Sequence, residues 1–96
     1  MKKSPAVYIM ANRKYGVLYT GVTSELIKRV YEHRESLVDG FTKRYACKRL
    51  VFFECHDTMY AAIAREKKIK SGSRADKIKL IESMNSGWND LFEIII

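Results

Sequence analysis

The hydrophobic positions of this chain of 96 residues fall into short runs whose spacing changes along the sequence. Residues 6–11 and 17–20 are apolar runs rich in β-branched and aromatic side chains, which is typical of strands. Residues 12–16 between them are mostly polar and end in Gly16, so this segment predicts a turn. Together the three segments predict an antiparallel hairpin.

A helical spacing comes after the hairpin. Apolar side chains recur every three to four positions over residues 24–36, and Thr23 or Ser24 can cap the start of this helix. Residues 38–48 mix basic, polar and aromatic side chains and predict a loop. Residues 50–53 are apolar throughout, as in strands that are buried on both faces, so we expect this strand at the centre of the sheet.

A second helix is predicted after this strand. It runs from a cap at Asp57 or Thr58 to about Ile69, and Gly72 separates it from the next helical segment. The alanines at positions 61, 62 and 64 allow this helix to pack closely on its neighbours.

A third helix is predicted from Ser73 to about Met84, because Ser73 and Asp76 have the spacing of a capping box. Three apolar residues are expected to form its buried face: Ile78, Ile81 and Met84. The last six residues, 91–96, are strongly apolar and β-prone. We expect them either to cover an exposed sheet edge or to pair two copies of the chain as a homodimer.

The order of these elements is β-β-α-β-α-α, without an internal repeat or a linker, and it fits a single domain over residues 1–96. The fold class predicted is α+β, with helices packed on a small three-stranded antiparallel sheet.

Charge favours a polyanionic partner. The formal net charge is +7, yet residues 81–96 hold three acidic and no basic side chains, so the basic excess lies in the body of the chain. Such a distribution favours nucleic acid, although a basic protein without any polyanionic partner fits the charge alone equally well. The sequence has no apolar run of ~20 residues and no signal-like segment, so we expect a cytoplasmic protein that does not enter a membrane.

Candidate chemistry is concentrated in the first 33 residues. Tyr8 and Tyr19 lie in the two predicted hairpin strands, and Arg29 and His33 are one helical turn apart. Phenol, guanidinium and imidazole groups near a basic surface make a candidate site for a phosphodiester. The alternatives are structural: two core tyrosines, an ion pair of Arg29 with Glu25, and a structural histidine.

Residues 6–66 resemble the GIY-YIG nuclease domain. The two name-giving triads resemble Ala6-Val7-Tyr8 and Tyr19-Thr20-Gly21, and a glutamate in a later helix, Glu66, completes the pattern. Residues 40–45 and 61–67 are similar more specifically to small single-domain members, which are themselves similar to the amino-terminal nuclease domain of the excision-repair endonuclease. Some family members carry a lysine soon after the second triad, where this chain has valine and threonine.

The resemblance implies a metal-dependent DNA endonuclease with little intrinsic sequence specificity that acts in DNA repair or recombination. It implies that Glu66 binds one divalent ion, Mg²⁺ or Mn²⁺, and that Arg29 stabilises the transition state. Tyr19 would orient or deprotonate the attacking water beside Tyr8. His33 would position the phosphate or the water, or transfer a proton. Without the resemblance, Glu66 is interpreted as a surface residue in helical ion pairs.

Further residues are candidates for contact with nucleic acid. Asn85 is the candidate for another phosphate contact, ahead of Asn89, and its alternative role is a left-handed helix cap. Phe41 is available to stack on a base. Basic and aromatic residues between the first helix and the third strand are expected to contact DNA: Lys43, Arg44, Tyr45, Lys48 and Arg49. Two further functions remain as hypotheses: a nucleic-acid-binding module with weak or no catalysis, and an interaction protein whose apolar tail binds a partner or pairs two copies. A nuclease of this size could also depend on a protein partner that supplies specificity.

Overall fold

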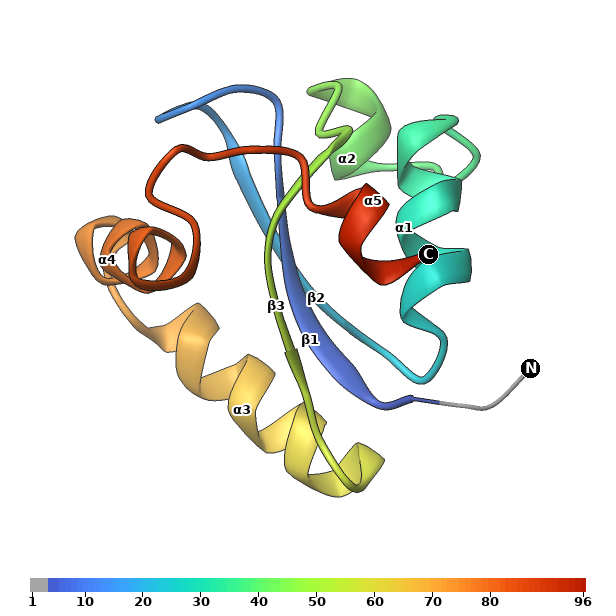
Figure 1. Cartoon of the computed structure of the whole chain (residues 1–96), viewed down its shortest axis with the longest axis vertical. Helices are drawn as coiled ribbons and strands as arrows, with labels where there is room; N and C mark the ends of the chain where they lie inside the picture. The colour runs from blue at the N-terminus through green and yellow to red at the C-terminus, as the bar shows by residue number, and fades with distance from the viewer. Residues whose placement is uncertain (1–3) are drawn as a thin grey trace.

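The sheet has three antiparallel strands in the order β2-β1-β3 over residues 4–96, which are the residues described in this computed structural model. β1 (Ala6–Ala11) is central, and β2 (Leu18–Thr23) and β3 (Arg49–Cys55) flank it. Figure 1 shows α1 and α5 on one face of the sheet and α3 and α4 on the other. All six residues of β1 are buried because both faces are covered. The predicted α+β fold is confirmed.

The helices lie close to their predicted places. α1 (Leu26–Arg34) follows the hairpin, and a single turn, α2 (Phe41–Arg44), lies inside the segment that was predicted as a loop. α3 (Met59–Ser71) and α4 (Arg74–Met84) follow β3, and α5 (Phe92–Ile95) comes last. No helix within residues 4–96 has the length and apolar character needed to cross a membrane.

Strand alternation in β1 divides the core into two layers. Val7 and Ile9 belong to a cluster with side chains of α3 and α4. Tyr8 and Met10 belong to the other cluster, which includes Leu26 and Val30 of α1 and Leu91. The phenol of Tyr8 therefore lies on the side of α1.

The prediction that residues 50–53 form the central strand is wrong, because β3 lies at the edge of the sheet. Its outer edge is covered by a loop instead of a strand. The Leu91 N–H donates to the Leu50 carbonyl oxygen at 2.8 Å, and the Leu50 N–H donates to Oδ1 of Asp90 at 3.2 Å. A continuous apolar run shows that both faces of a strand are buried, but it does not show what covers the edges.

The apolar tail is helical, so the β character expected of residues 91–96 is wrong. Asp90 accepts the Phe92 N–H at 3.2 Å, and α5 begins there, with Phe92 and Ile95 packed against the cluster on the α1 side. The expectation that the tail covers a sheet edge is confirmed by the bond from Leu91 to Leu50.

Two helix caps are as predicted. Oγ1 of Thr58 accepts the Ala61 N–H at 3.1 Å, and Ser73 and Asp76 form the capping box of α4. On α4, Ile81 is buried as expected, whereas Met84 is exposed.

The cap predicted for α1 is wrong. The N-cap is Glu25, which makes no side-chain capping bond, and Oγ1 of Thr23 accepts the Glu25 N–H at 3.0 Å instead. This contact forms a tight turn before the helix.

Candidate active site

Tyr8 and Tyr19 are diagonal neighbours on one face of the hairpin. In the register of the two strands Tyr8 pairs with Gly21 and Met10 pairs with Tyr19, so the two tyrosines lie two positions apart across the ladder. Their ring centroids are 6.4 Å apart. Tyr8 is buried, whereas Tyr19 is partly exposed at the outer strand. The sheet therefore brings the two predicted phenols together and leaves one of them accessible.

His33 completes a group of three rings. Its ring centroid lies 5.6 Å from that of Tyr8 and 5.5 Å from that of Tyr19. Nε2 is 2.8 Å from the Tyr8 hydroxyl, and Nδ1 is 2.9 Å from Oγ1 of Thr42. Thr42 is buried in α2, and nothing in the sequence pattern distinguished it from the other polar residues of its segment.

The imidazole of His33 is neutral near neutral pH. Burial, and to a smaller extent the nearby Arg29 guanidinium, lowers its pKa from 6.5 to about 4, while Glu32 acts in the opposite direction. A neutral imidazole has one donor and one acceptor nitrogen. Either Tyr8 donates to Nε2 and Nδ1–H donates to Thr42, or Thr42 donates to Nδ1 and Nε2–H donates to Tyr8. Both arrangements satisfy the buried chain of hydrogen bonds.

The pKa of the Tyr8 phenol is affected by several nearby charges. Its pKa is raised above the ordinary value, first by burial and then by Tyr19, and the carboxylates of Glu32 and Glu66 raise it further. The Arg29 guanidinium opposes them. Tyr8 therefore stays protonated, and charged side chains of both α1 and α3 act on its phenol.

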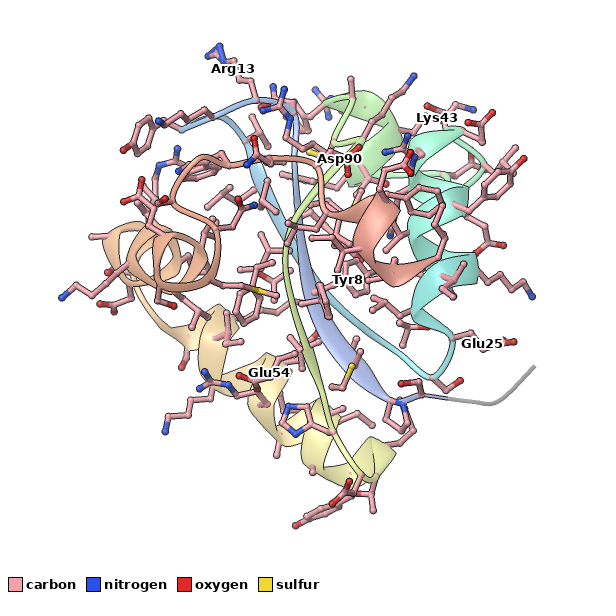
Figure 2. The ribbon with its side chains drawn as sticks, viewed as in Figure 1. Tyr8, Arg13, Glu25, Lys43, Glu54 and Asp90 are labelled. Atoms are coloured by element: carbon pink, nitrogen blue, oxygen red, sulfur yellow. The ribbon has the colours of Figure 1, made fainter. Side chains whose placement is uncertain are left out.

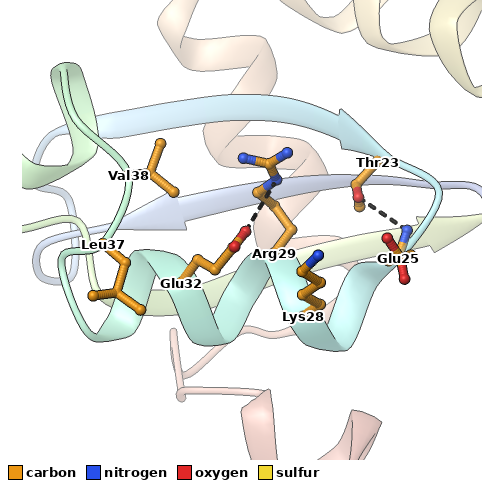
Figure 3. A pocket seen from close by; sticks show the side chains of 7 residues that line it. All are labelled: Thr23, Glu25, Lys28, Arg29, Glu32, Leu37 and Val38. Carbon is orange, nitrogen blue, oxygen red and sulfur yellow. Dashed lines mark hydrogen bonds and ion pairs between the residues drawn. The ribbon is translucent and has the colours of Figure 1, made fainter.

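Arg29 lies in a polar pocket between α1 and the end of β2 (Figure 3). Its side chain is 44% exposed, more than the core-side position expected from the helical spacing, and its Nε lies 3.8 Å from Oε1 of Glu32. The ion pair expected as the alternative was with Glu25, but the structure pairs Arg29 with Glu32. Glu32 is thus a residue of the site that the sequence reasoning missed, although its position three residues after Arg29 could have indicated it.

Glu66, the predicted metal ligand, lies in α3. Its side chain is only 13% exposed, and its Oε2 lies 2.9 Å from Nζ of Lys70. No group of three or more metal-ligating side chains occurs within residues 4–96. Mg²⁺ prefers oxygen ligands and keeps several waters, so one carboxylate fits this ion better than it fits zinc.

A pocket of about 270 Å³ opens at the outer edge of β2, lined by Leu18, Tyr19, Thr20, Phe41, Lys70 and Lys77. It joins the two sides of the sheet, because Phe41 belongs to α2 and Lys70 to α3. The Phe41 ring centroid lies 6.0 Å from that of Tyr19 and 4.8 Å from that of Tyr45. Accessible phenol, aromatic rings and ammonium groups therefore share one open surface.

A family model described as the GIY-YIG catalytic domain matches residues 4–79. The chain belongs to the GIY-YIG family. GIY-YIG is a nuclease family, and the resemblance of the two triads to it is thereby confirmed.

Several GIY-YIG relatives are proteins named UPF0213. One from Haloquadratum walsbyi is 43% identical over 65 residues, which cover 68% of this chain and 73% of the relative. Another, from Staphylococcus saprophyticus, is 40% identical over 68 residues, covering 71% and 83%. The solution NMR structure of a UPF0213 protein from Bacillus halodurans has a TM-score of 0.57 and 25% identity, and the match covers 91% of this chain and 92% of that one. These names state no activity.

The basic residues predicted to contact DNA in this GIY-YIG domain differ in their exposure and in their partners. Lys43 is exposed on the outer surface of α2, away from the interior position of Tyr8 (Figure 2), and pairs with Asp39 at 3.5 Å. The Arg44 guanidinium lies 5.3 Å from the Tyr45 ring centroid, and Lys48 is exposed. Arg49 differs, because it is only partly exposed and its guanidinium donates to the Trp88 carbonyl oxygen at 3.0 Å. Arg49 therefore helps to close the β3 edge.

Asn85 is not part of the group of rings and charges in this GIY-YIG domain. Its amide donates to the Val51 and Asn89 carbonyl oxygens at 3.1 and 2.8 Å, and its Oδ1 accepts the Asn89 N–H at 3.0 Å. Its φ of −147° is not left-handed, so the cap conformation considered as its alternative role is wrong. The side chain fastens the loop after α4 to β3, on the edge opposite to Tyr19.

Proposed function

We propose that this protein is a metal-dependent endonuclease that hydrolyses DNA phosphodiester bonds with little intrinsic sequence specificity. One observation carries the proposal: the two phenols and the imidazole are in contact, and the charges of Arg29 and Glu66 act on the same Tyr8 phenol. A guanidinium and a carboxylate whose charges act on this group of rings, together with the accessible phenol of Tyr19, support the proposal, because phosphodiester hydrolysis requires charge stabilisation and an activated water.

Tyr19 is proposed to orient the attacking water, because Tyr8 is buried and already bonded to His33. The water oxygen bonds to phosphorus as the bond to the 3′ oxygen breaks. The water proton passes to the Tyr19 oxygen when that group is a phenolate, and the leaving oxygen takes a proton from solvent. The buried, neutral chain of hydrogen bonds formed by Tyr8, His33 and Thr42 is proposed to have a positioning role. The Tyr8 and His33 rings pack against the Tyr19 ring and hold it in place.

Arg29 is proposed to bind the phosphoryl oxygens. A guanidinium is always charged and can donate to two oxygens at once, and this one is exposed at the mouth of a pocket. Its present partner, Glu32, lies at 3.8 Å in an exposed pair, which is weak enough for a phosphate to replace.

Glu66 is proposed to hold one Mg²⁺ or Mn²⁺ ion. When bound, such an ion would stabilise negative charge on the phosphoryl oxygens. The burial of Glu66 among basic residues of α3 supports the role, because a carboxylate that is largely shielded from water requires a cation.

Contacts with the DNA backbone are proposed for Lys43, Arg44 and Lys48, and a stacking contact for Tyr45. Residues 4–96 form one sheet with its helices and include no second module that would read base edges, which supports low specificity or a protein partner that supplies it. A place in DNA repair or recombination is proposed on the similarity to the excision-repair nuclease domain.

A nucleic-acid-binding module with weak or no catalysis is the second candidate. It is favoured by one observation: both charges of the site already have partners, Glu32 for Arg29 and Lys70 for Glu66. A binding protein could retain such pairs permanently, whereas a nuclease has to exchange them.

The experiment is cleavage of a panel of linear, nicked, branched and single-stranded DNA, with RNA alongside, in Mg²⁺ or Mn²⁺. The wild type is expected to cleave at least one DNA substrate, and Glu66→Ala is expected to bind DNA without cleaving it. Binding should weaken steeply with salt because phosphate contacts dominate. Binding without cleavage by the wild type would favour the binding module, and salt-independent binding would exclude both candidates.

A further inference from the structure

Lys70 stands between the Glu66 carboxylate and the pocket that Tyr19 lines. Its Nζ lies 2.9 Å from Oε2 of Glu66, and the same side chain, 52% exposed, lines the opening at β2 with Tyr19. Lys77 lines this opening too, but its Nζ donates to the Gly72 and Lys70 carbonyl oxygens at 2.8 and 3.4 Å. Lys77 is therefore held at the end of α3 by backbone carbonyl groups, whereas Lys70 is the lysine of the pocket whose partner is a carboxylate side chain.

The pairing of Lys70 with Glu66 conflicts with the metal role of Glu66. An ammonium group within 2.9 Å of a carboxylate occupies space and charge that a divalent cation needs. Once such a cation is bound, the ammonium group is repelled and requires another anion. The flexible four-carbon stem of lysine allows this movement, and the opening beside Tyr19 is already within its reach.

We propose that Lys70 is a catalytic residue that exchanges partners. In the metal-free protein it neutralises Glu66, and in the loaded protein it binds a non-bridging oxygen of the scissile phosphate in the pocket beside Tyr19. This inference rests on the proposed nuclease function. It also accounts for a cation beside Tyr19 in a chain that has Val22 and Thr23, and no lysine, at the end of β2.

The exchange couples metal and substrate. Metal alone has to displace Lys70 from Glu66, so Lys70 weakens metal binding in the absence of substrate. A phosphodiester in the pocket provides the displaced ammonium with a new partner, so metal and substrate favour each other's binding. A merely structural ion pair would give neither the competition nor the coupling.

The first measurement is Mn²⁺ binding without nucleic acid, followed by the electron paramagnetic resonance signal of the free ion. Lys70→Gln is compared with Lys68→Gln, which removes the same charge from the same helix but lines a different pocket, with Arg65 and Asp76. Lys70→Gln is expected to bind Mn²⁺ about fivefold more tightly than Lys68→Gln, since an ion pair with Glu66 no longer competes. Glu66→Gln is expected to lose this binding.

The second measurement is single-turnover cleavage at saturating Mn²⁺. Lys70→Gln is expected to be slower than the wild type by about 10²-fold, with partial recovery in Lys70→Arg and no comparable loss in Lys68→Gln. Tighter metal binding together with slower chemistry is the signature of the exchange. Equal Mn²⁺ affinity in the two glutamine variants, or wild-type cleavage by Lys70→Gln, would overturn it.

The nuclease function and the role of Lys70 can be rejected separately. If the wild type cleaves no substrate, the nuclease function and the phosphate contact of Lys70 are both overturned. The Mn²⁺ titration still decides whether Lys70 competes with a metal ion for Glu66. If the wild type cleaves and Lys70→Gln cleaves equally well, the nuclease function stands and the role of Lys70 is rejected.

Discussion

Gly21 lies directly opposite Tyr8 in the hairpin, and a Cβ atom at Gly21 would lie 2.5 Å from the Tyr8 hydroxyl oxygen. The phenol can occupy its place beside His33 only because position 21 has no side chain. The glycine of the second triad is therefore explained by the tyrosine of the first, and the two motifs form one packed unit.

Gly21→Ala should consequently displace Tyr8 and destabilise the protein by about 1–3 kcal/mol, the usual cost of inserting a methyl group into a packed core. Urea denaturation measures the stability, and the cleavage rate should fall with it. Gly72→Ala is the matched control, since a Cβ there would meet no atom closer than 3.4 Å. Equal stability of the two variants would contradict the close packing of Gly21 on Tyr8.

The neutral imidazole of His33 predicts a loss of stability in mild acid. Its pKa is lowered to about 4 in the folded protein from an ordinary value of 6.5, so between these pH values the unfolded chain binds a proton that the folded chain does not. The free energy of unfolding should therefore be fully developed above about pH 6.5 and fall by about 2 kcal/mol toward pH 4.

The comparison of wild type with His33→Gln isolates this effect. Hydrogen bonds lower the pKa of Asp76 and of Glu82, and both carboxylates add acid sensitivity to the two proteins alike. The variant should have a flatter dependence between pH 6.5 and pH 4, measured by denaturant unfolding at each pH. Parallel curves would mean that His33 does not resist protonation in the fold.

Arg29→Ala should lower the single-turnover rate on the order of 10²–10³-fold if the guanidinium stabilises the transition state. Its effect on stability should stay below about 1 kcal/mol, because the pair with Glu32 is exposed. Glu32→Gln removes the same ion pair and keeps Arg29, so it should retain most of the rate. A loss below about tenfold in Arg29→Ala, matched by Glu32→Gln, would assign Arg29 to the ion pair alone.

Asn85→Ala should reduce stability without a specific effect on cleavage. It leaves the Val51 carbonyl oxygen and the Asn89 N–H without their partners, which costs about 2 kcal/mol. Thermal unfolding and the cleavage rate at a temperature where the variant is folded separate the two effects. Asn89→Ala, at an exposed position, is the control. A large loss of cleavage rate in folded Asn85→Ala would instead support the prediction that Asn85 contacts the phosphate.

The local elements of this fold could be predicted from sequence because their signals are local. The capping box of Ser73 and Asp76 and the cap at Thr58 depend on residues three positions apart. The position of β3 depends on which segment covers its outer edge, and that segment, around Asp90 and Leu91, is forty residues away in the chain. An apolar run contains no information about so distant a partner.

The same distinction applies to the site. Tyr8, Tyr19, Arg29, His33 and Glu66 could be named because their order and spacing resemble a family pattern. The partners that determine their states could not: Thr42 is one polar residue among several, and Lys70 is one lysine among several on α3. Hydrogen bonds and ion pairs of this kind are fixed by the tertiary structure.

The loop around Asp90 and Leu91 covers part of the outer edge of β3, whereas the outer edge of β2 has no neighbouring strand within the part of the chain that the structure describes. An exposed strand edge has unpaired N–H and C=O groups, so a strand from another molecule can pair with it and cause aggregation. Here Lys70 and Lys77 flank it, and like charges on two copies repel each other. The two lysines beside Tyr19 would thus have a second effect, because their charge opposes the pairing of two copies along this edge.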